Sequence, residues 1–438
     1  MNQTVNVSRN RLRVGMVGLG MIFDETYRPL FEQLHREPLF RPDFGVVQVE
    51  LSAVASRTGV RAKKYQSSAG DRISPFVNCS GPGAMEELLG QPVDAVCIAT
   101  PDDRHFDAAR RALAAGKHVL IEKPSVLRLQ ELDELLALAQ RNGVLAKVVY
   151  HKLADPDHKK LRTHVANGVL RHVNNGYCSL LEPKAISGQQ FAEWITGRNP
   201  GTYVACHYIK LIDFTFGTPL PSAPVPPCRL ARVTATGQRG LVGPAGGPTW
   251  DSVQMQMVYA YPDGREAAFD LHTSWVTPDN FPGYVEQEVQ FRFDNGVWNA
   301  HQRKRGVELT VEGRSPGDFK YTPNHHYNGT FLEPWNESSQ RGYGIEILRR
   351  FFEEVAYVEF GGPGGDRDKR LQVMRGLLYN DLSADRATVA AVQALEAILN
   401  EHAQGRPGAS VQVNSPHAGL ALIAPQRPEP VVLYQPRV

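Results

Sequence analysis

Between residues 11 and 150, short apolar runs alternate with segments of helical spacing, and this alternation limits the fold more than any other feature of the sequence. Helical spacing occurs in 105–115 and 129–142, and a glycine closes each segment. The apolar runs have the length of buried strands: 13–17, 49–55, 93–99, 117–121 and 145–150. Strands and helices that alternate in this way form a parallel sheet with helices on both faces.

The first of these strands runs into Gly18-x-Gly20. Such glycines allow a tight turn and a close approach of the backbone to a pyrophosphate, and the next helix offers its free N–H groups. Phe23 stands where the usual GxGxxG motif has its third glycine. The pattern also fits an ordinary strand-to-helix turn, but its place at the start of the series favours a dinucleotide site that includes Met21 and Ile22.

A charged triplet, Glu122-Lys123-Pro124, follows the strand at 117–121. Ligands of open α/β sheets bind at the carboxyl ends of the strands. Burying a charged pair there costs free energy unless the pair faces a cleft or has polar partners. Pro124 restricts the backbone that follows Lys123. By itself the triplet fits a strand-end ion pair between Glu122 and Lys123, and the glycine motif upstream favours a functional site.

The second strand ends at Ser56-Arg57, where NAD-preferring domains carry an acid that bonds the ribose diol. A carboxylate would repel a 2′-phosphate, whereas serine and arginine can hydrogen-bond it. Lys63 or Lys64 on the following helix would add charge. We therefore expect NADP to be preferred over NAD, the alternative being that Arg57 stacks on the adenine or lies in solvent.

Three motifs follow one another: Gly18-x-Gly20, Ala99-Thr100-Pro101-x-x-x-His105, and Ala115-Gly116-Lys117-His118-Val119-x-x-Glu122-Lys123-Pro124. Over residues 11–125 this order resembles the glucose–fructose oxidoreductase / inositol dehydrogenase (Gfo/Idh/MocA) family. The resemblance implies a Rossmann domain with a parallel sheet, then an α+β domain with a large, mostly antiparallel open sheet. It also implies an NAD(P)-dependent dehydrogenase or reductase that acts on CH–OH groups of sugars, cyclitols or related polyols. Thr100, Pro101, His105, Glu122 and Lys123 would then lie at the cofactor.

From residue 229 onward the pattern changes to β-type alternation. Apolar and polar residues alternate in 253–259 and 289–293, and an Asp-Asn-Gly turn follows at 294–296. Alternation predicts a sheet with one face packed on helices and one face available. We expect a homo-oligomer, a dimer or tetramer, that forms through this sheet. The alternative is that loops of the same chain cover the available face of the sheet.

The segments between these patterns suggest a division of the chain. We expect a polar arm at 1–10, the Rossmann domain at 11–150, the substrate-binding and oligomerisation domain at 151–403, and a Pro-rich arm at 404–438. A loop is predicted at 38–45, and an amphipathic helix at 384–402.

A second catalytic group is expected near the start of a helix around residue 207. Many relatives carry Asp-x-x-x-His there, with another Asp three residues further on. The favoured register places His207 on the family's histidine, so that Tyr203 and Lys210 replace the two acids. A shifted register would place Lys210 on the histidine and keep Asp213. A histidine that only packs against the sheet is the structural alternative.

These residues suggest a mechanism. Hydride transfer at a carbinol carbon requires a base within hydrogen-bond reach of the oxygen. Lys123 is the expected base, and His207 is the second candidate, with Tyr203 and Lys210 nearby. Several further polar residues could read substrate hydroxyls: His151, Lys152, Trp194, Arg198, His325 and His326. The adjacent histidines lack a third ligand by spacing, so no metal site is expected.

Composition agrees with a globular enzyme of 438 residues, 42% hydrophobic and 21% charged. The net charge of +2 predicts no strong affinity for nucleic acid or anionic membranes. Five scattered cysteines, no apolar leader and no membrane-length apolar run point to a reducing, cytoplasmic location.

Two other functions remain open at this point. One is a glycosidase of the same fold family that uses tightly held NAD for transient oxidation. The other is a non-catalytic, nucleotide-sensing regulator, which the presence of Lys123 disfavours. The sequence does not name the substrate.

Overall fold

A computed structural model describes residues 10–190, 194–220, 223–243, 246–279, 285–302, 324–362, 365–414 and 419–436. The chain forms two compact units, each made from three segments. The first unit contains the residues up to Ser125, Asp133–Val149 and Asn328–Ser383. The second contains Val126–Leu132, Tyr150–Tyr327 and the residues from Ala384 onward.

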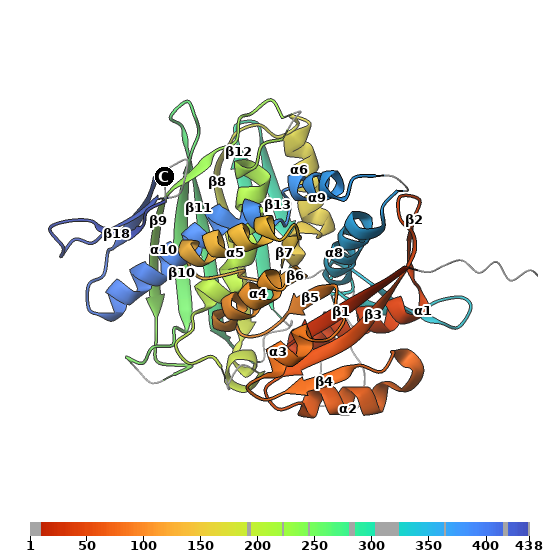
Figure 1. Ribbon diagram of the computed structural model, residues 1–438. Coiled ribbons are helices and arrows are strands. Elements are labelled where there is room, and N and C mark those ends of the chain that lie inside the picture. The colour runs from red at the N-terminus through yellow and green to blue at the C-terminus, as the bar shows by residue number, and fades with distance from the viewer. Residues whose placement is uncertain are drawn as a thin grey trace, which may run out of the picture. The chain divides into compact units, whose positions relative to one another are not determined.

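The first unit holds a seven-stranded sheet (Figure 1) in the order β2-β3-β1-β5-β6-β7, with β4 paired to β3. Every pair is parallel except β2 with β3. The strands are β1 Asn10–Val17, β2 Leu39–Arg41, β3 Gly45–Ser56, β4 Val77–Ser80, β5 Ala95–Ile98, β6 His118–Glu122 and β7 Ala146–Val149. Strands β5, β6 and β7 are buried throughout, as parallel strands covered on both faces must be. The predicted Rossmann fold is confirmed.

Two short strands of this sheet were not predicted. Residues 39–41, expected to lie in a loop, pair antiparallel with the start of β3. Strand β4 contains Asn78 and Ser80, and these polar residues interrupt the apolar run that would predict a buried strand.

The helical elements of the unit are η1 Phe23–Tyr27, α1 Arg28–Arg36, α2 Val60–Ala69, η2 Gly70–Arg72, α3 Ala84–Leu89, η3 Asp102–Arg104, α4 His105–Ala114, α5 Leu129–Arg141, α8 Tyr343–Phe360 and α9 Arg367–Gly376. Helix α5 begins in residues that cluster with the second unit.

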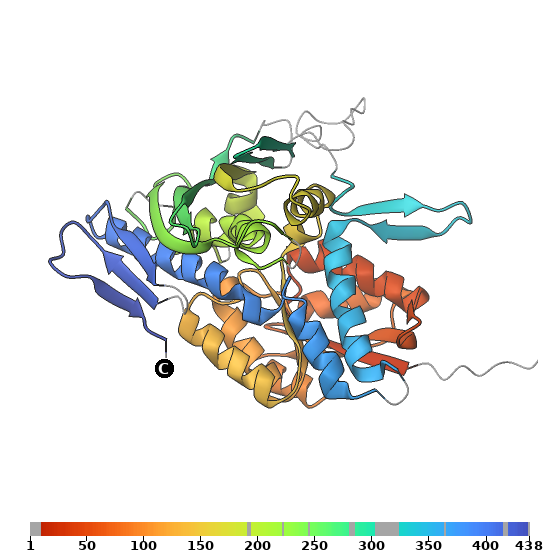
Figure 2. The same ribbon diagram turned by 90° about the horizontal axis from the view of Figure 1, so that it is seen from above.

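A late segment of the chain returns to the first unit. Residues 328–383 contribute the hairpin β14 Gly329–Leu332 and β15 Ser338–Arg341, which projects from α8 in cyan in Figure 2, together with α8 and α9. The continuous 151–403 domain expected from the sequence is therefore not the division that the structure shows. One segment of the second unit begins at Tyr150, and another, Val126–Leu132, lies within the range 11–150.

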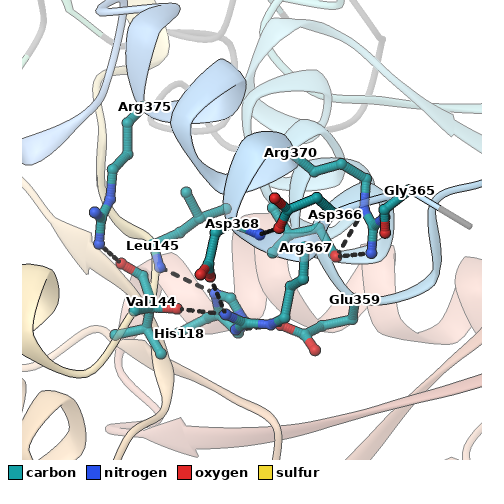
Figure 3. Close-up of polar contacts among 12 residues, drawn as sticks. His118, Val144, Leu145, Glu359, Gly365, Asp366, Arg367, Asp368, Arg370 and Arg375 are labelled. Atoms are coloured by element: carbon teal, nitrogen blue, oxygen red, sulfur yellow. Dashed lines mark hydrogen bonds and ion pairs between the residues drawn. The ribbon is translucent and has the colours of Figure 1, made fainter.

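Buried polar contacts hold this returning segment. Lys147 of β7 is fully buried, and its Nζ lies 3.3 Å from carboxylate oxygens of both Glu354 and Asp381. Figure 3 shows a second cluster, in which His118 Nδ1 accepts from the Leu145 N–H and Nε2 contacts Glu359 over 2.9 Å. Arg367 also donates to Glu359. Although burial acts in the opposite sense, His118 and Arg367 together lower the pKa of Glu359 to about 2.

The second unit holds a nine-stranded sheet in the order β13-β12-β8-β11-β10-β9-β16-β17-β18. All of its pairs are antiparallel except β8 with β11, so the expected mostly antiparallel sheet is confirmed. The strands are β8 Val173–Pro183, β9 Arg229–Gln238, β10 Ser252–Ala260, β11 Glu266–Thr277, β12 Glu286–Phe293, β13 Gly296–His301, β16 Ser410–Asn414, β17 Gly419–Ile423 and β18 Val431–Tyr434. Gly296 begins β13 at the predicted hairpin turn.

Helices cover one face of this sheet. In Figure 1 α10 crosses the strands β9 to β11, and Val253, Met255 and Met257 of β10 are buried on that side. Their neighbours Gln254 and Gln256 are not buried. The helical elements are η4 His151–Leu153, α6 Pro156–Ala166, η5 Ile186–Gln190, η6 Gly201–Ala205, α7 Cys206–Ile212, η7 Asp213–Gly217, η9 Leu382–Asp385 and α10 Arg386–Ala403. Helix α10 confirms the amphipathic helix predicted at 384–402.

The C-terminal residues differ from the expected Pro-rich arm. Strands β16, β17 and β18 extend the sheet beyond β9, because Ser410 and Val411 pair with Thr234 and Val233 of that strand. Between β17 and β18, Pro425 lies in a turn. In the parts of the chain that the structure describes, no helix has the length and apolar character needed to span a membrane.

Candidate functional site

The glycine loop after β1 has the geometry of a phosphate cradle. Gly18 adopts a φ of +90°, and a Cβ there would lie 2.5 Å from the carbonyl oxygen of Ala99, so the position requires glycine. A Cβ on Gly20 would meet no atom within 4 Å. The helical run begins at Met21, and the first N–H groups of a helix have no acceptor within it, so they are suited to an anion. This arrangement fits the pyrophosphate of a dinucleotide.

The helix after the loop starts with a wide turn. Phe23–Tyr27 is π-helical, and the Thr26 hydroxyl donates to the Ile22 carbonyl oxygen over 2.9 Å. Phe23, at the position of the usual third glycine, is buried edge-on against Tyr65 with ring centroids 5.4 Å apart. A third glycine normally lets the helix pack closely on the strand. Here an aromatic side chain fills that space and the helix widens.

The end of β3 carries the residues expected to read the ribose. Ser56 Oγ accepts from the Gly59 N–H over 3.1 Å, and Arg57 is exposed. Arg61, in the first turn of α2, donates to the carbonyl oxygen of Leu19 over 2.9 Å. Sequence reasoning named Lys63 and Lys64 instead and missed Arg61. Its place in the first helical turn after β3 is the signal that points to it.

The end of β6 carries the charged pair. Glu122 is 4% exposed and its Oε1 accepts from the Tyr27 hydroxyl over 3.0 Å. Burial raises the pKa of Glu122 to about 7, although Lys123 and the Tyr27 hydrogen bond act in the opposite sense. Lys123, the next residue, is half-buried. Glu122 is thus held inside the unit, while Lys123 stands at the strand end.

His105 connects the ends of two strands. Its ring is 1% exposed, with Nδ1 2.8 Å from the Pro124 carbonyl oxygen and Nε2 2.8 Å from the Thr100 carbonyl oxygen. Both nitrogens therefore face backbone carbonyl oxygens, one of them in the loop of Thr100 and Pro101. Because β3, β1, β5 and β6 are neighbours, the predicted cofactor residues gather at one edge of the sheet.

In the second unit, Tyr203 and His207 share one face of the helical run 201–212. Both are half-buried and lie four residues apart, whereas residues 204–206 and 208–212 are buried. His207 lies beside His151, with ring centroids 6.0 Å apart, and His151 contacts Tyr327 edge-on at 5.4 Å. The structure thus brings together two histidines that the sequence separates by more than fifty residues.

Lys210 occupies a different environment. Its side chain is fully buried, its Nζ donates to the Ala384 carbonyl oxygen, and it lies 3.7 Å from Asp385 Oδ1. The Tyr150 hydroxyl donates to the other oxygen of Asp385 over 3.1 Å. Asp213 lies at the end of the same run, where burial raises its pKa to about 6. Lys210 is therefore engaged in an internal ion pair.

The other polar residues named from the sequence are dispersed. Lys152 is buried and donates to Gln302 over 2.9 Å and to Gln287. Trp194 contacts Tyr203 with ring centroids 5.0 Å apart, and Tyr203 in turn lies 6.2 Å from Trp275. Arg198 is half-buried before η6, and His325 and His326 are exposed in a turn. Among the residues that the structure describes, no three His, Cys, Asp or Glu side chains cluster as metal ligands would.

Comparison with known proteins agrees with the geometry at the glycine loop and the strand ends. Residues 12–150 match the model of the oxidoreductase family with an NAD-binding Rossmann fold, Gfo/Idh/MocA. Residues 12–150 of the chain are therefore assigned to the NAD-binding Rossmann domain of the Gfo/Idh/MocA family. The match covers the first unit's sheet from β1 to β7, where the loop of Gly18 and the triplet of Lys123 lie.

Individual oxidoreductases are similar to this chain over part of their length. The dTDP-3,4-didehydro-2,6-dideoxy-alpha-D-glucose 3-reductase of Actinomadura kijaniata is 29% identical over 180 residues, 41% of this chain and 48% of that protein. The NADP(+) scyllo-inositol 2-dehydrogenase of Bacillus subtilis is 30% identical over 132 residues, 30% of this chain and 38% of that protein. The matched segments thus span less than half of these relatives.

A fold like that of this chain occurs in solved structures that match it over nearly its full length. The crystal structure of GenD2 from gentamicin A biosynthesis, in complex with NAD, superimposes with a TM-score of 0.60 at 19% identity. It covers 93% of this chain and 97% of the GenD2 chain. At this identity the likeness establishes the fold.

Proposed function

We propose that this protein is an NAD(P)-dependent oxidoreductase that interconverts a carbinol and a carbonyl of a sugar, cyclitol or related polyol. The observation that carries the proposal is that the glycine cradle at Gly18 and the half-buried Lys123 lie at the same edge of the sheet, after β1 and β6, which flank β5. A cofactor seated on the first residues of a helix extends along the carboxyl edge of such a sheet.

The residues of the first unit then have distinct tasks. Gly18, Gly20 and the N–H groups of Met21 and Ile22 would hold the pyrophosphate. A bound nicotinamide supplies the donor or acceptor of hydride. Lys123 takes or returns the proton of the substrate oxygen, and as an ammonium it stabilises negative charge on that oxygen.

The second unit would supply substrate recognition. His207 and His151 present two imidazoles beside each other, able to exchange protons and to bond hydroxyls. Trp194, in a turn before the helical run, and Tyr203, on the same helical face as His207, are both half-buried and form an aromatic pair. Sugar and cyclitol rings offer an apolar C–H face to such a surface and hydroxyls to the imidazoles. The names of the similar proteins, a sugar-nucleotide reductase and an inositol dehydrogenase, lie within this substrate class.

The proposal includes a preference for NADP. Arg57 follows β3 directly where NAD-preferring domains carry an acid, and Arg61 places a second guanidinium at the glycine loop. Guanidinium groups suit a 2′-phosphate because they bind it in a bidentate manner.

We also propose a cytoplasmic homo-oligomer. All five cysteines are buried free thiols, which suits a reducing compartment. The face of the nine-stranded sheet opposite α10 carries the exposed Gln254 and the half-buried Gln256, and it would be the surface between subunits.

A two-step experiment tests the function. Calorimetry with NADPH, NADP, NADH and NAD first establishes cofactor binding and preference. Absorbance at the reduced nicotinamide band then follows turnover with a panel of cyclitols, free sugars and sugar nucleotides. Binding with net oxidation or reduction of a panel member supports the proposal. Binding without net turnover, accompanied by glycoside cleavage, would instead identify a glycosidase that regenerates its cofactor.

A further inference from the structure

A buried hydroxyl points from the helix after the glycine loop to the strand end that carries Lys123. Tyr27 is the last residue of the π-helical turn and is fully buried. Its hydroxyl donates to Glu122 Oε1 over 3.0 Å, and Glu122 is the last residue of β6. Turns of the π type are rare and occur frequently at functional sites. The contact therefore links the phosphate-binding helix to the residue adjacent to Lys123.

Glu122 needs such a contact for physical reasons. A carboxylate that is 4% exposed loses most of its hydration, and it remains charged only with hydrogen-bond donors or positive charge beside it. Tyr27 supplies a donor and Lys123 supplies the charge. A hydroxyl bound to an ionised carboxylate makes a stronger hydrogen bond than the same hydroxyl bound to a neutral acid.

We infer that Tyr27 and Glu122 form a positioning pair for Lys123, in which the Tyr27 hydroxyl holds the Glu122 carboxylate and that carboxylate fixes the backbone and the charge at the end of β6. The inference rests on the proposed oxidoreductase function, because only then does Lys123 carry a proton in the reaction. The pair ties the placement of the cofactor helix to the placement of the acid/base.

The pair should respond to pH near neutrality. Burial raises the pKa of Glu122 to about 7, so the carboxylate gains and loses its proton in the physiological range. The titratable groups that face it are Tyr27 from η1, Lys123 from its own strand end, and Cys97 from β5. Burial raises the pKa of Cys97, which keeps that thiol neutral. The charge within the pair therefore changes through Glu122.

Denaturant unfolding between pH 6 and pH 8.5 tests the pair without any substrate. Tyr27→Phe removes the donor that favours the carboxylate, so it raises the pH at which folded Glu122 ionises by about 0.5–1 unit, the effect of one lost hydrogen bond. The stability lost in Y27F should consequently grow as the pH rises through about 7. In a Glu122→Gln background, Y27F should cost the same at every pH.

Tyr65→Phe is the matched control, because Tyr65 is a buried tyrosine on α2 of the same unit. The free energy of unfolding that Y65F loses should not change across this pH range. The inference is overturned if the loss of unfolding free energy in Y27F is constant with pH. It is also overturned if the loss in Y65F varies with pH by the same amount.

Kinetics then test the positioning role. With a substrate that the wild-type protein turns over, the acid limb of the kcat profile should move up by the same 0.5–1 unit in Y27F. In E122Q this limb should disappear. An unmoved limb in an active enzyme rejects the positioning role, whereas absence of turnover with every substrate rejects the proposed function and leaves the unfolding experiment to decide the pair.

Discussion

Lys210 Nζ lies 3.7 Å from the carboxylate of Asp385, and both side chains are at most 1% exposed. The Ala384 carbonyl oxygen also accepts from Lys210, and Tyr150 donates to Asp385. The polar partners that Lys210 and Asp385 contact thus all belong to the second unit itself. This environment suits a structural lysine, and it favours the register in which His207 is the functional group.

Lys210→Met should therefore reduce stability rather than chemistry. Removal of one partner leaves Asp385 as a buried charge without its cation, which typically costs about 3–5 kcal/mol. Denaturant unfolding measures the loss, and Lys160→Met, an exposed lysine on α6, is the control. Removing both charges with K210M and Asp385→Asn should restore part of the loss. A folded, stable K210M protein with turnover reduced a hundredfold would show instead that Lys210 belongs to the reaction.

Lys123→Ala should lower kcat by about 10²-fold or more, the effect of losing an acid/base group, while cofactor affinity persists. Lys117→Ala is the matched control because it precedes the opposite end of β6. Steady-state rates and calorimetry with the cofactor measure the two effects separately. Near-normal turnover in K123A would remove Lys123 from the mechanism.

Arg57→Ala should weaken NADP binding by roughly tenfold, as expected for the loss of one charge-assisted contact, and leave NAD binding nearly unchanged. Arg141→Ala, an exposed cation at the end of α5, should change neither affinity. Arg61→Ala should act in the same direction as R57A, since Arg61 reaches the glycine loop. Calorimetry with both cofactors decides the question, and tighter binding of NAD than of NADP by the wild-type protein would contradict the preference.

His207→Asn should lower kcat/KM by about 10²-fold if His207 bonds the reacting hydroxyl, with a smaller effect on cofactor affinity. His164→Asn on α6 changes a half-buried histidine of the same unit and should have little effect. His151→Asn should resemble H207N, because the two rings are neighbours. Initial rates across substrate concentrations separate kcat from KM. Full activity in H207N would return His207 to a packing role.

The parallel sheet was predictable because its signals are local. Each of the five predicted strands is an apolar run bounded by turn residues, and Gly18 is required by its own backbone angle and by the nearby Ala99 carbonyl. Strand β4 escaped prediction because Asn78 and Ser80 interrupt any apolar pattern. Its strand conformation comes from pairing with β3, which is a long-range interaction.

The return of residues 328–383 was not predictable from local pattern. Lys147 donates to the carbonyl oxygen of Met374, 227 positions along the chain, and pairs with Glu354 and Asp381. In the sequence these are ordinary charged residues of a strand and two later segments. Similarly, the strands β16 to β18 follow turn-rich sequence and form because the edge of β9 is available to them.

The sequence by itself determined the alternating Rossmann sheet, the cradle at Gly18 and the position of Lys123 at a strand end, since spacing, turn residues and strand length are encoded in neighbouring positions. Only the tertiary structure decided that Glu122 is bound by Tyr27, that Lys210 is an internal cation, and that His151 lies beside His207. Burial and the identity of a polar partner depend on segments far apart in the chain, and these two properties decide whether a charged side chain can act on a ligand or is used to hold the fold.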